Sequence, residues 1–287
     1  WNKDNINIKN VNWLYDDGSD VTKWYNDAKN GTVDWVALTP ATTVTAKNDE
    51  LFDTYSYVSD TTSPSFMNFY NLNREAYVNV NDNTTGASTK SEEEQERTAA
   101  AMKNVHFRRA LSFGLDRASY NAQVNGEELK VNSLRNCYVP GNFVALEEDT
   151  TVSINGTDTT FPAGTYFGAI EQAQIDADGV AIKVWDPDGN DGAGSSDGWY
   201  NVDNAVAELD TAIEELSADG ITIDEENPIY IDMPYPSSLE AYSNQANAYK
   251  QSIEASLGGK VIVNLVDCVT SDGWYYAGYY TDYGYEA

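Results

Sequence analysis

The sequence has 287 residues, which is enough to bury one large hydrophobic core or two modest ones. Its 46 acidic residues outnumber its 17 lysines and arginines, so the formal net charge is −29. A chain this acidic is repelled by phosphate backbones and anionic lipid surfaces, which excludes nucleic acid as an expected partner. No stretch approaches the roughly 20 apolar residues of a membrane span.

The first quarter of the chain predicts a strand–helix–strand unit. Residues 6–15 alternate apolar and polar side chains with period 2, as a half-buried strand does. Residues 21–31 predict a short helix that ends at a glycine, and residues 33–38 predict a more buried strand. Together they indicate a βαβ unit. A further strand is expected at residues 66–73.

The middle of the chain predicts consecutive helices. Residues 81–90 are polar and rich in Gly, Thr and Ser, and therefore predict a loop. The acidic run at 91–97 begins a helix, because carboxylates are favourable in a first turn. Apolar residues recur at helical spacing over 105–115, and a second helix is expected from 117 to 125, ending at Gly126.

The composition shifts after Pro140, and the rest of the chain continues to alternate helix and strand. This alternation predicts an α/β protein, and the composition shift divides it into residues 1–143 as part of a first lobe and residues 144–287 as a second lobe. The last residues show no natural stop, so the second lobe is expected to be truncated at its C-terminal end. The elements expected in the second lobe are a hairpin at 150–168 around Asn155-Gly156, a polar loop at 186–198, helices at 203–217 and 239–257, and strands at 229–233 and 261–266.

Two features resemble catalytic residues, and each has a simpler explanation. His106 is the single histidine, and it lies between Val105 and Phe107 on an expected helix, where a packing or capping role is favoured over catalysis. Residues 194–198 match the Gly-x-Ser-x-Gly pattern of serine hydrolases, with Ser195 or Ser196 as nucleophile. That pattern requires a buried strand before it and a helix after it, whereas this copy lies in a loop. No nucleotide- or cofactor-binding motif is present, so no cofactor is expected.

Two further groups of residues raise the question of metals and disulfides. Cys137 and Cys268 are far apart and lack metal-ligand spacing, so two buried thiols are favoured, with a disulfide as the alternative. The polar loop resembles a calcium-binding loop, but it lacks the required glycine and the closing glutamate. An ordinary solvated loop is therefore favoured, and no metal is expected. The weak calcium candidates are Asp186, Asp188, Asn190 and Asp197.

One stretch carries a resemblance to a known family. Residues 104–120, Asn-Val-His-Phe-Arg-Arg-Ala-Leu-Ser-Phe-Gly-Leu-Asp-Arg-Ala-Ser-Tyr, resemble a helix-pair signature of the family 5 extracellular solute-binding proteins. Other segments agree with that family in order and spacing, and the resemblance covers almost the whole chain. It is closest to the oligopeptide-binding lipoproteins of Gram-positive bacteria. The other segments lie at 1–6, 29–34, 134–140 with 143–144, and 200–205 with 216–220.

The resemblance implies a fold and a function. The fold would be the periplasmic-binding-protein class II architecture of the cluster C type, here incomplete, in which two lobes close on a peptide by a hinge motion. The chain would be the receptor component of a peptide ABC importer and not an enzyme, with an oligopeptide ligand and an ABC permease as partners. Its parent would be an extracellular lipoprotein tethered to the outer leaflet of the cytoplasmic membrane through a lipid anchor outside this chain.

The resemblance also suggests which residues border the peptide. Phe69, Tyr70 and Asn71 fall on the strand that borders the cleft, and Tyr138 and Phe143 fall on a loop whose counterparts line side-chain pockets. Aromatic and amide side chains suit a pocket that accepts varied peptides, although aromatic residues on strands are more often core residues.

The sequence departs from the family pattern in two respects. The N-terminal portion of the family is missing, and the chain reads as a segment of a longer protein. Asp282 superficially fits the family's peptide-anchoring aspartate, but the true motif is expected beyond residue 287. A peptide-sensing or adhesion lipoprotein on the same scaffold remains the main alternative function, and a serine hydrolase is a remote one.

Overall fold

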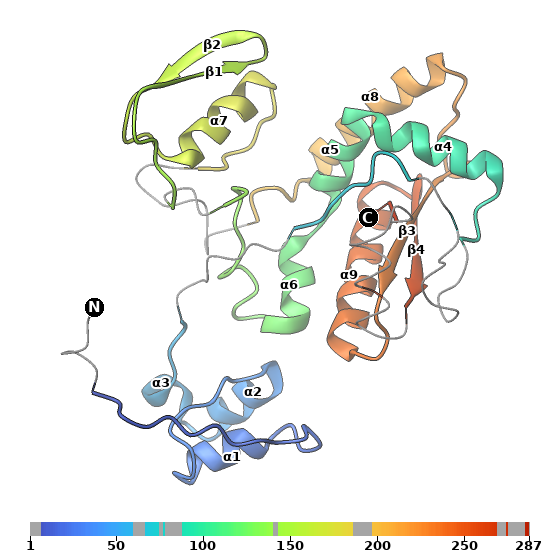
Figure 1. The fold of residues 1–287 in the computed structure, drawn as a ribbon. Helices are drawn as coiled ribbons and strands as arrows, with labels where there is room; N and C mark the ends of the chain where they lie inside the picture. Colours follow the sequence, from blue (N-terminus) through green and yellow to red (C-terminus); the bar gives the residue numbers. More distant parts are fainter. Residues whose placement is uncertain are drawn as a thin grey trace. The chain divides into compact units, whose positions relative to one another are not determined.

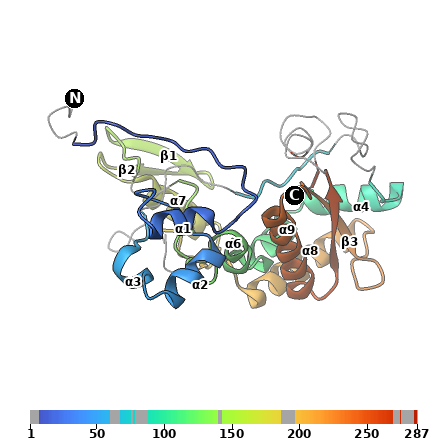
Figure 2. The ribbon, with the colours of Figure 1, turned by 90° about the horizontal axis from the view of Figure 1, so that it is seen from below.

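The computed structural model describes residues 7–59, 67–74, 77, 88–139, 143–185, 197–268, 274 and 285–286. The chain divides into two compact units, one up to Val58 and one from Ser59 onward (Figures 1 and 2). Within the described residues, no helix has both the length and the apolar character needed to cross a membrane.

The first unit contains three helices, α1 (Lys23–Lys29), α2 (Pro40–Asn48) and α3 (Phe52–Tyr55). The sequence predicted α1 but neither α2 nor α3. Helix α2 is rich in threonine, which has a low helix propensity. It forms because Thr39 and Thr42 make a capping box and because Pro40 fits the first helical position.

The strands predicted at 6–15 and 33–38 do not form in the described residues. Residues 7–15 and 33–38 are neither strand nor helix, and Trp13 and Trp35 are 89% and 66% exposed. A strand needs a neighbouring strand to bond its backbone groups, and the described residues of this unit supply none. The predicted βαβ unit is therefore represented only by its helix. Residues 67–73 likewise belong to neither a helix nor a strand.

Three consecutive helices of the second unit were predicted from the sequence, the last two of them by the family signature, and their caps explain their boundaries. Ser91 forms a capping box with Glu94, Asn104 accepts a hydrogen bond from the Phe107 N–H, and Asp116 caps the third helix. The helices are α4 (Glu92–Lys103), α5 (Val105–Gly114) and α6 (Arg117–Asn125).

A β-hairpin follows, as predicted. Strands β1 (Thr150–Ile154) and β2 (Thr157–Phe161) pair antiparallel around Asn155-Gly156. Both turn residues have positive φ, +48° and +77°, which this two-residue turn requires. The sequence did not predict the next helix, α7 (Phe167–Ala177), where Gly168 lies against the Trp185 indole.

The last part of the unit is a strand–helix–strand motif. Strand β3 (Ile229–Tyr235) pairs parallel with β4 (Val261–Asp267), with Ile229 opposite Val261. Helix α9 (Glu240–Ser256) connects the strands and packs on them, while α8 (Val202–Ala218) packs against α5 (Figure 1). These four elements were predicted, and the mixture of helices and strands is compatible with the expected α/β class.

The larger of two hydrophobic clusters in the described residues joins α4, α5, α8, α9, β3 and β4. The predicted stripe of α8 is buried at Ala205, Leu209, Ala212 and Leu216. The largest side chains of this core that are almost inaccessible to solvent are Met102, Phe107, Leu111, Val184, Leu209, Ile229, Ile231, Tyr249, Ile253, Leu257 and Val261.

Candidate functional site

The 67–74 segment carries three of the predicted peptide-binding residues, and it lies against α5 and α9. Asn68 Nδ2 donates a hydrogen bond to the Tyr249 hydroxyl at 3.2 Å, and the Tyr70 hydroxyl lies 3.3 Å from Ser112 Oγ. Burial raises the pKa of Tyr70, which keeps its phenol neutral. Tyr70 therefore serves chiefly as a packing residue that attaches the segment to the core.

The two neighbours of Tyr70 are placed differently. The Phe69 ring is 63% exposed and therefore accessible to a ligand. The Asn71 N–H donates to the main-chain oxygen of Glu286 at 3.1 Å, and Asn71 Oδ1 accepts the Asn73 N–H at 2.9 Å. Asn71 thus fixes the backbone of the segment, while Phe69 is the residue that it presents to solvent.

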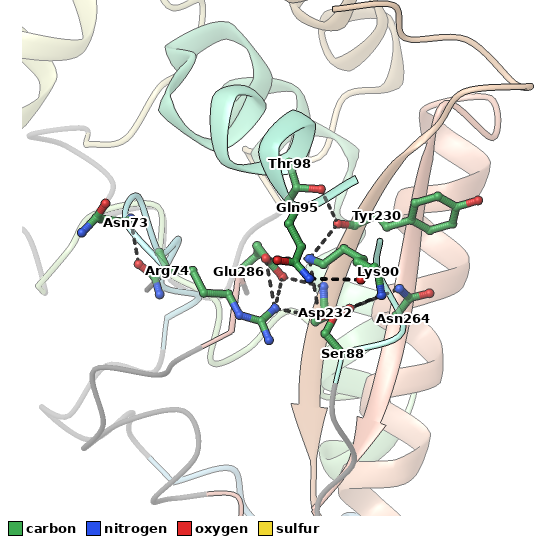
Figure 3. Close-up of polar contacts among 11 residues, drawn as sticks. Asn73, Arg74, Ser88, Lys90, Gln95, Thr98, Tyr230, Asp232, Asn264 and Glu286 are labelled. Carbon is green, nitrogen blue, oxygen red and sulfur yellow. Dashed lines mark hydrogen bonds and ion pairs between the residues drawn. The ribbon is translucent and has the colours of Figure 1, made fainter. Parts of the chain in front are cut away.

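Arg74, the last residue of the same segment, belongs to a buried charge cluster with Lys90, Asp232 and Glu286 (Figure 3). Arg74 Nη1 lies 2.6 Å from Asp232 Oδ2 and 2.9 Å from Glu286 Oε2. Lys90 Nζ lies 2.6 Å from Glu286 Oε1 and 3.4 Å from Asp232 Oδ2. All four side chains are at most 4% exposed.

The cluster is electrically balanced, which makes its burial tolerable. Two cations face two anions, and further donors reach Asp232 from Ser88 Oγ at 2.6 Å and Asn264 Nδ2 at 3.1 Å. Burial alone would raise the pKa of Asp232, but Lys90, Ser88 and Arg74 outweigh burial and lower that pKa overall. Asp232 is therefore charged in the folded protein at neutral pH.

A second set of contacts holds the loop that carries Tyr138. Arg117 donates hydrogen bonds from Nε and Nη2 to Asp197 Oδ1, at 2.8 and 2.6 Å. Its Nη1 donates to the main-chain oxygen of Arg135, and its Nη2 also donates to Asn136 Oδ1. The Trp199 indole N–H donates to the main-chain oxygen of Asn136 at 3.2 Å. One arginine on α6 therefore fixes the backbone just before Tyr138.

The loop presents its two predicted contact residues to solvent. Tyr138 and Phe143 are 59% and 67% exposed. The Tyr138 N–H donates to both carboxylate oxygens of Glu171 on α7, at 3.2 and 3.1 Å. Burial raises the pKa of Glu171, an effect that the Tyr138 N–H and Cys137 partly oppose. Exposed aromatic rings on a fixed backbone are suited to contact a ligand.

The five predicted residues thus form two groups, and within the described residues no hydrogen bond joins one group to the other. The prediction that they line one site is not tested by these contacts. The buried charge cluster was not predicted from the sequence, because its members are separated by up to 212 residues along the chain. Isolated charges in apolar surroundings, such as Asp232 between Ile231 and Met233 in a strand, were the available signal.

The other candidates from the sequence have structural roles or lie outside the described residues. His106 Nδ1 on α5 lies 2.5 Å from Glu208 Oε2 on α8, which is a partly buried contact between the two helices. Cys137 and Cys268 are separate buried thiols, as favoured. Of the weak calcium ligands, Asp197 binds Arg117, whereas Asp186, Asp188 and Asn190 lie outside the described residues, as do Ser195, Ser196 and Asp282. Among the residues that the structure describes, no three His, Cys, Asp or Glu side chains are grouped to hold a metal.

The chain is similar in sequence to known proteins. No protein-family model matches it. It is 30% identical over 280 residues to the oligopeptide-binding protein AmiA of Streptococcus pneumoniae serotype 4, a match that covers 98% of this chain and 38% of AmiA. It is 31% identical over 273 residues to the oligopeptide-binding protein SarA of Streptococcus gordonii, covering 95% of this chain and 36% of SarA.

A third relative agrees with these two. The oligopeptide-binding protein AliA of Streptococcus pneumoniae serotype 4 is 28% identical over 266 residues, which is 92% of this chain and 36% of AliA. The chain spans a little over a third of the length of these relatives. The resemblance predicted from the sequence is therefore confirmed: nearly the whole chain is similar to one part of the streptococcal oligopeptide-binding proteins.

Proposed function

We propose that this chain is part of the substrate-binding receptor of a peptide ABC importer, and that it binds oligopeptides non-covalently. The observation that carries the proposal is the match of 92–98% of the chain to proteins named as oligopeptide-binding. A shared sequence over this length supports a shared fold and, with it, a shared class of ligand.

The proposed fold is the two-lobed class II arrangement of the cluster C type, with residues 1–143 contributing to one lobe and residues 144–287 to the other. Peptide would lie in the cleft between the lobes. Strand-like hydrogen bonds would hold its main chain, and loosely fitting pockets would accept its side chains. The proposed contacts are Phe69, Tyr70, Asn71, Tyr138 and Phe143.

The exposed aromatic residues are the strongest of these contacts. Phe69, Tyr138 and Phe143 are all exposed. The segment that carries Phe69 is attached to α5 and α9, and Arg117 on α6 fixes the backbone just before Tyr138. A ring that packs on a ligand and not on its own protein can contribute to binding with little effect on folding. Tyr70 and Asn71 contribute by fixing the segment.

The proposal also covers partners, location and chemistry. The partners are an oligopeptide and an ABC permease, and the parent protein would be an extracellular lipoprotein held at the cell surface by a lipid anchor outside this chain. The chain would not be an enzyme, since the relatives are named for binding. No cofactor is part of the proposed function.

Native mass spectrometry of the purified protein and calorimetry with a mixed peptide library test the proposal. The 287-residue chain is compared with a version lengthened to the span of its relatives. We expect co-purified peptide or a binding heat in at least the longer version. Binding only by the longer version would place decisive contacts outside residues 1–287, and binding by neither would contradict the proposal.

The residue assignments have their own test. Alanine substitution of Phe69, Tyr138 or Phe143 should weaken peptide binding by about 1–3 kcal/mol while changing the unfolding free energy by less than about 0.5 kcal/mol. Alanine substitution of the exposed Val144 (54% exposed) is the control, and its effect on binding should be smaller. Equal, negligible effects at all four positions would refute the assignments but not the function.

A peptide-sensing or adhesion lipoprotein on the same scaffold is the second candidate. Deleting the parent gene and measuring growth on peptides as the nitrogen source distinguishes uptake from sensing. Loss of growth supports import, and unchanged growth together with peptide binding supports sensing.

A further inference from the structure

Glu286 connects three parts of the second unit that are far apart in the sequence. Its side chain accepts hydrogen bonds from Lys90 Nζ at 2.6 Å, Arg74 Nη1 at 2.9 Å and the Asp232 main-chain N–H at 2.9 Å (Figure 3). Its main-chain oxygen accepts the Asn71 N–H at 3.1 Å. One residue thus bonds the 67–74 segment, the chain before α4 and strand β3.

The 67–74 segment is held by Glu286 at two points. Asn71 bonds its main chain, and Arg74, three residues later, bonds its carboxylate. The described residues of the segment form no strand, so no ladder of backbone hydrogen bonds fixes them. Within the described residues, the contacts that hold the segment include Asn68 with Tyr249, Tyr70 with Ser112 and Arg74 with Asp232. The two bonds to Glu286 add to them, and the position of the exposed Phe69 depends on all of these contacts.

The carboxylate is also required for the charge balance of the cluster. Glu286 is 1% exposed as a residue, so solvent does not screen it. Removing its charge leaves Arg74 and Lys90 facing Asp232 alone, which is an uncompensated buried positive charge. Breaking one partner of a buried ion pair in this way is strongly unfavourable, whereas removing one charge of each sign is much less so. The local structure must then rearrange or admit water.

We propose that Glu286 is a positioning residue for peptide binding: through Asn71 and Arg74 it fixes the 67–74 segment against strand β3 and so presents Phe69 to the ligand. The inference rests on the proposed function for its ligand, but the positioning itself is a property of the structure. Glu286 acts through other residues and does not contact the peptide.

The test compares three variants with the unmodified chain. Glu286→Gln keeps the shape of the side chain and removes its charge. Glu286→Gln combined with Lys90→Met restores neutrality with Arg74 facing Asp232. Thr98→Val is the matched control, because it removes the bond from Thr98 Oγ1 to the Tyr230 oxygen at 2.9 Å on the same strand, and within the described residues no hydrogen bond joins Thr98 to the 67–74 segment. Glu286→Asp serves as a milder variant if Glu286→Gln does not fold.

Two measurements are made on each variant. The first is hydrogen exchange of the Asn71 amide, and the second is peptide affinity by calorimetry, in whichever of the 287-residue and the lengthened proteins binds peptide. Glu286→Gln should speed Asn71 exchange and weaken affinity by about tenfold or more, equivalent to about 1.4 kcal/mol. The double variant should recover part of both losses. Thr98→Val should change the peptide affinity by no more than about twofold. It should also change the Asn71 exchange rate, measured relative to amides in α9, by no more than about twofold.

The outcomes separate the two proposals. If Glu286→Gln speeds Asn71 exchange no more than Thr98→Val does, the positioning role is overturned. Faster exchange with unchanged peptide affinity also overturns it, because the segment would then be mobile without consequence for binding. If no version of the protein binds peptide, the proposed function fails, while the exchange data still decide whether Glu286 fixes the segment.

Discussion

The close approach between Gly198 and Asn136 gives a sharp prediction about the loop that carries Tyr138. A Cβ at Gly198 would lie 2.4 Å from Asn136 Nδ2 and 3.0 Å from its Cγ. Because carbon atoms in contact are separated by about 3.5–4.0 Å, the amide of Asn136 would have to retreat by about 1 Å. Asn136 is only 6% exposed and has little room to do so.

The retreat would break the bond from Arg117 Nη2 to Asn136 Oδ1, which is 2.7 Å long. Losing a hydrogen bond to a charged group costs about 1.5–3 kcal/mol. Replacing glycine by alanine stabilises by about 0.4–1 kcal/mol through the unfolded chain. Gly198→Ala should therefore lower the unfolding free energy by about 1–2 kcal/mol, or the melting temperature by about 2–8 °C.

Urea unfolding followed by tryptophan fluorescence measures this change, because Trp199 lies beside the altered contact. Gly114→Ala is the matched control. Its Cβ would meet Ser256 Cβ at an ordinary 3.4 Å in α5, so its stability should be unchanged or slightly higher. A stable Gly198→Ala protein, or an equal loss in Gly114→Ala, would refute the steric argument.

Three further predictions concern the second unit. Phe107→Ala removes a fully buried ring and should lower the urea unfolding free energy by about 3–5 kcal/mol with an unchanged m-value; a loss below about 1 kcal/mol would mean that the ring is not in the core. Ser91→Ala removes the capping box of α4 and should cost about 1 kcal/mol in the same assay, whereas Ser91→Asp should cost much less. The lowered pKa of Asp232 stabilises the fold above the ordinary value of 3.8, and this contribution is lost as the pH falls below 3.8. The difference in stability between the unmodified chain and Asp232→Asn should therefore shrink from pH 7 to pH 3, and a difference that is constant with pH would contradict the argument.

The helices around the family signature show what local sequence can predict. Ser91, Asn104 and Asp116 each stand directly before a helix that the sequence predicted, and each caps that helix. Capping and periodicity act within a few residues, so the sequence contains the whole cause. The hairpin at Asn155-Gly156 was predictable for the same reason, because the turn itself requires positive φ.

The strands expected in the first unit show where this reasoning fails. Residues 7–15 have the period-2 pattern of a strand, but a strand also needs a partner, and the pattern does not specify one. Helix α2 shows the opposite case: it forms although the sequence did not predict it. Its residues have low helix propensity, and its N-terminal cap and its packing determine that the helix forms. The helix α7 lacks a capping side chain, so its start carried no local signal.

The sequence by itself determined the family resemblance, the signature helices, the hairpin and the strands that flank α9. Each depends on neighbouring residues or on a match that spans the chain. Only the tertiary structure decided that Arg74, Lys90, Asp232 and Glu286 meet in one buried cluster, because no local rule relates charges that are up to 212 residues apart. Burial excludes water from such charges, so their hydrogen-bond and ion-pair partners must come from the folded chain itself. Arg74, at the end of the 67–74 segment, is such a partner of Glu286.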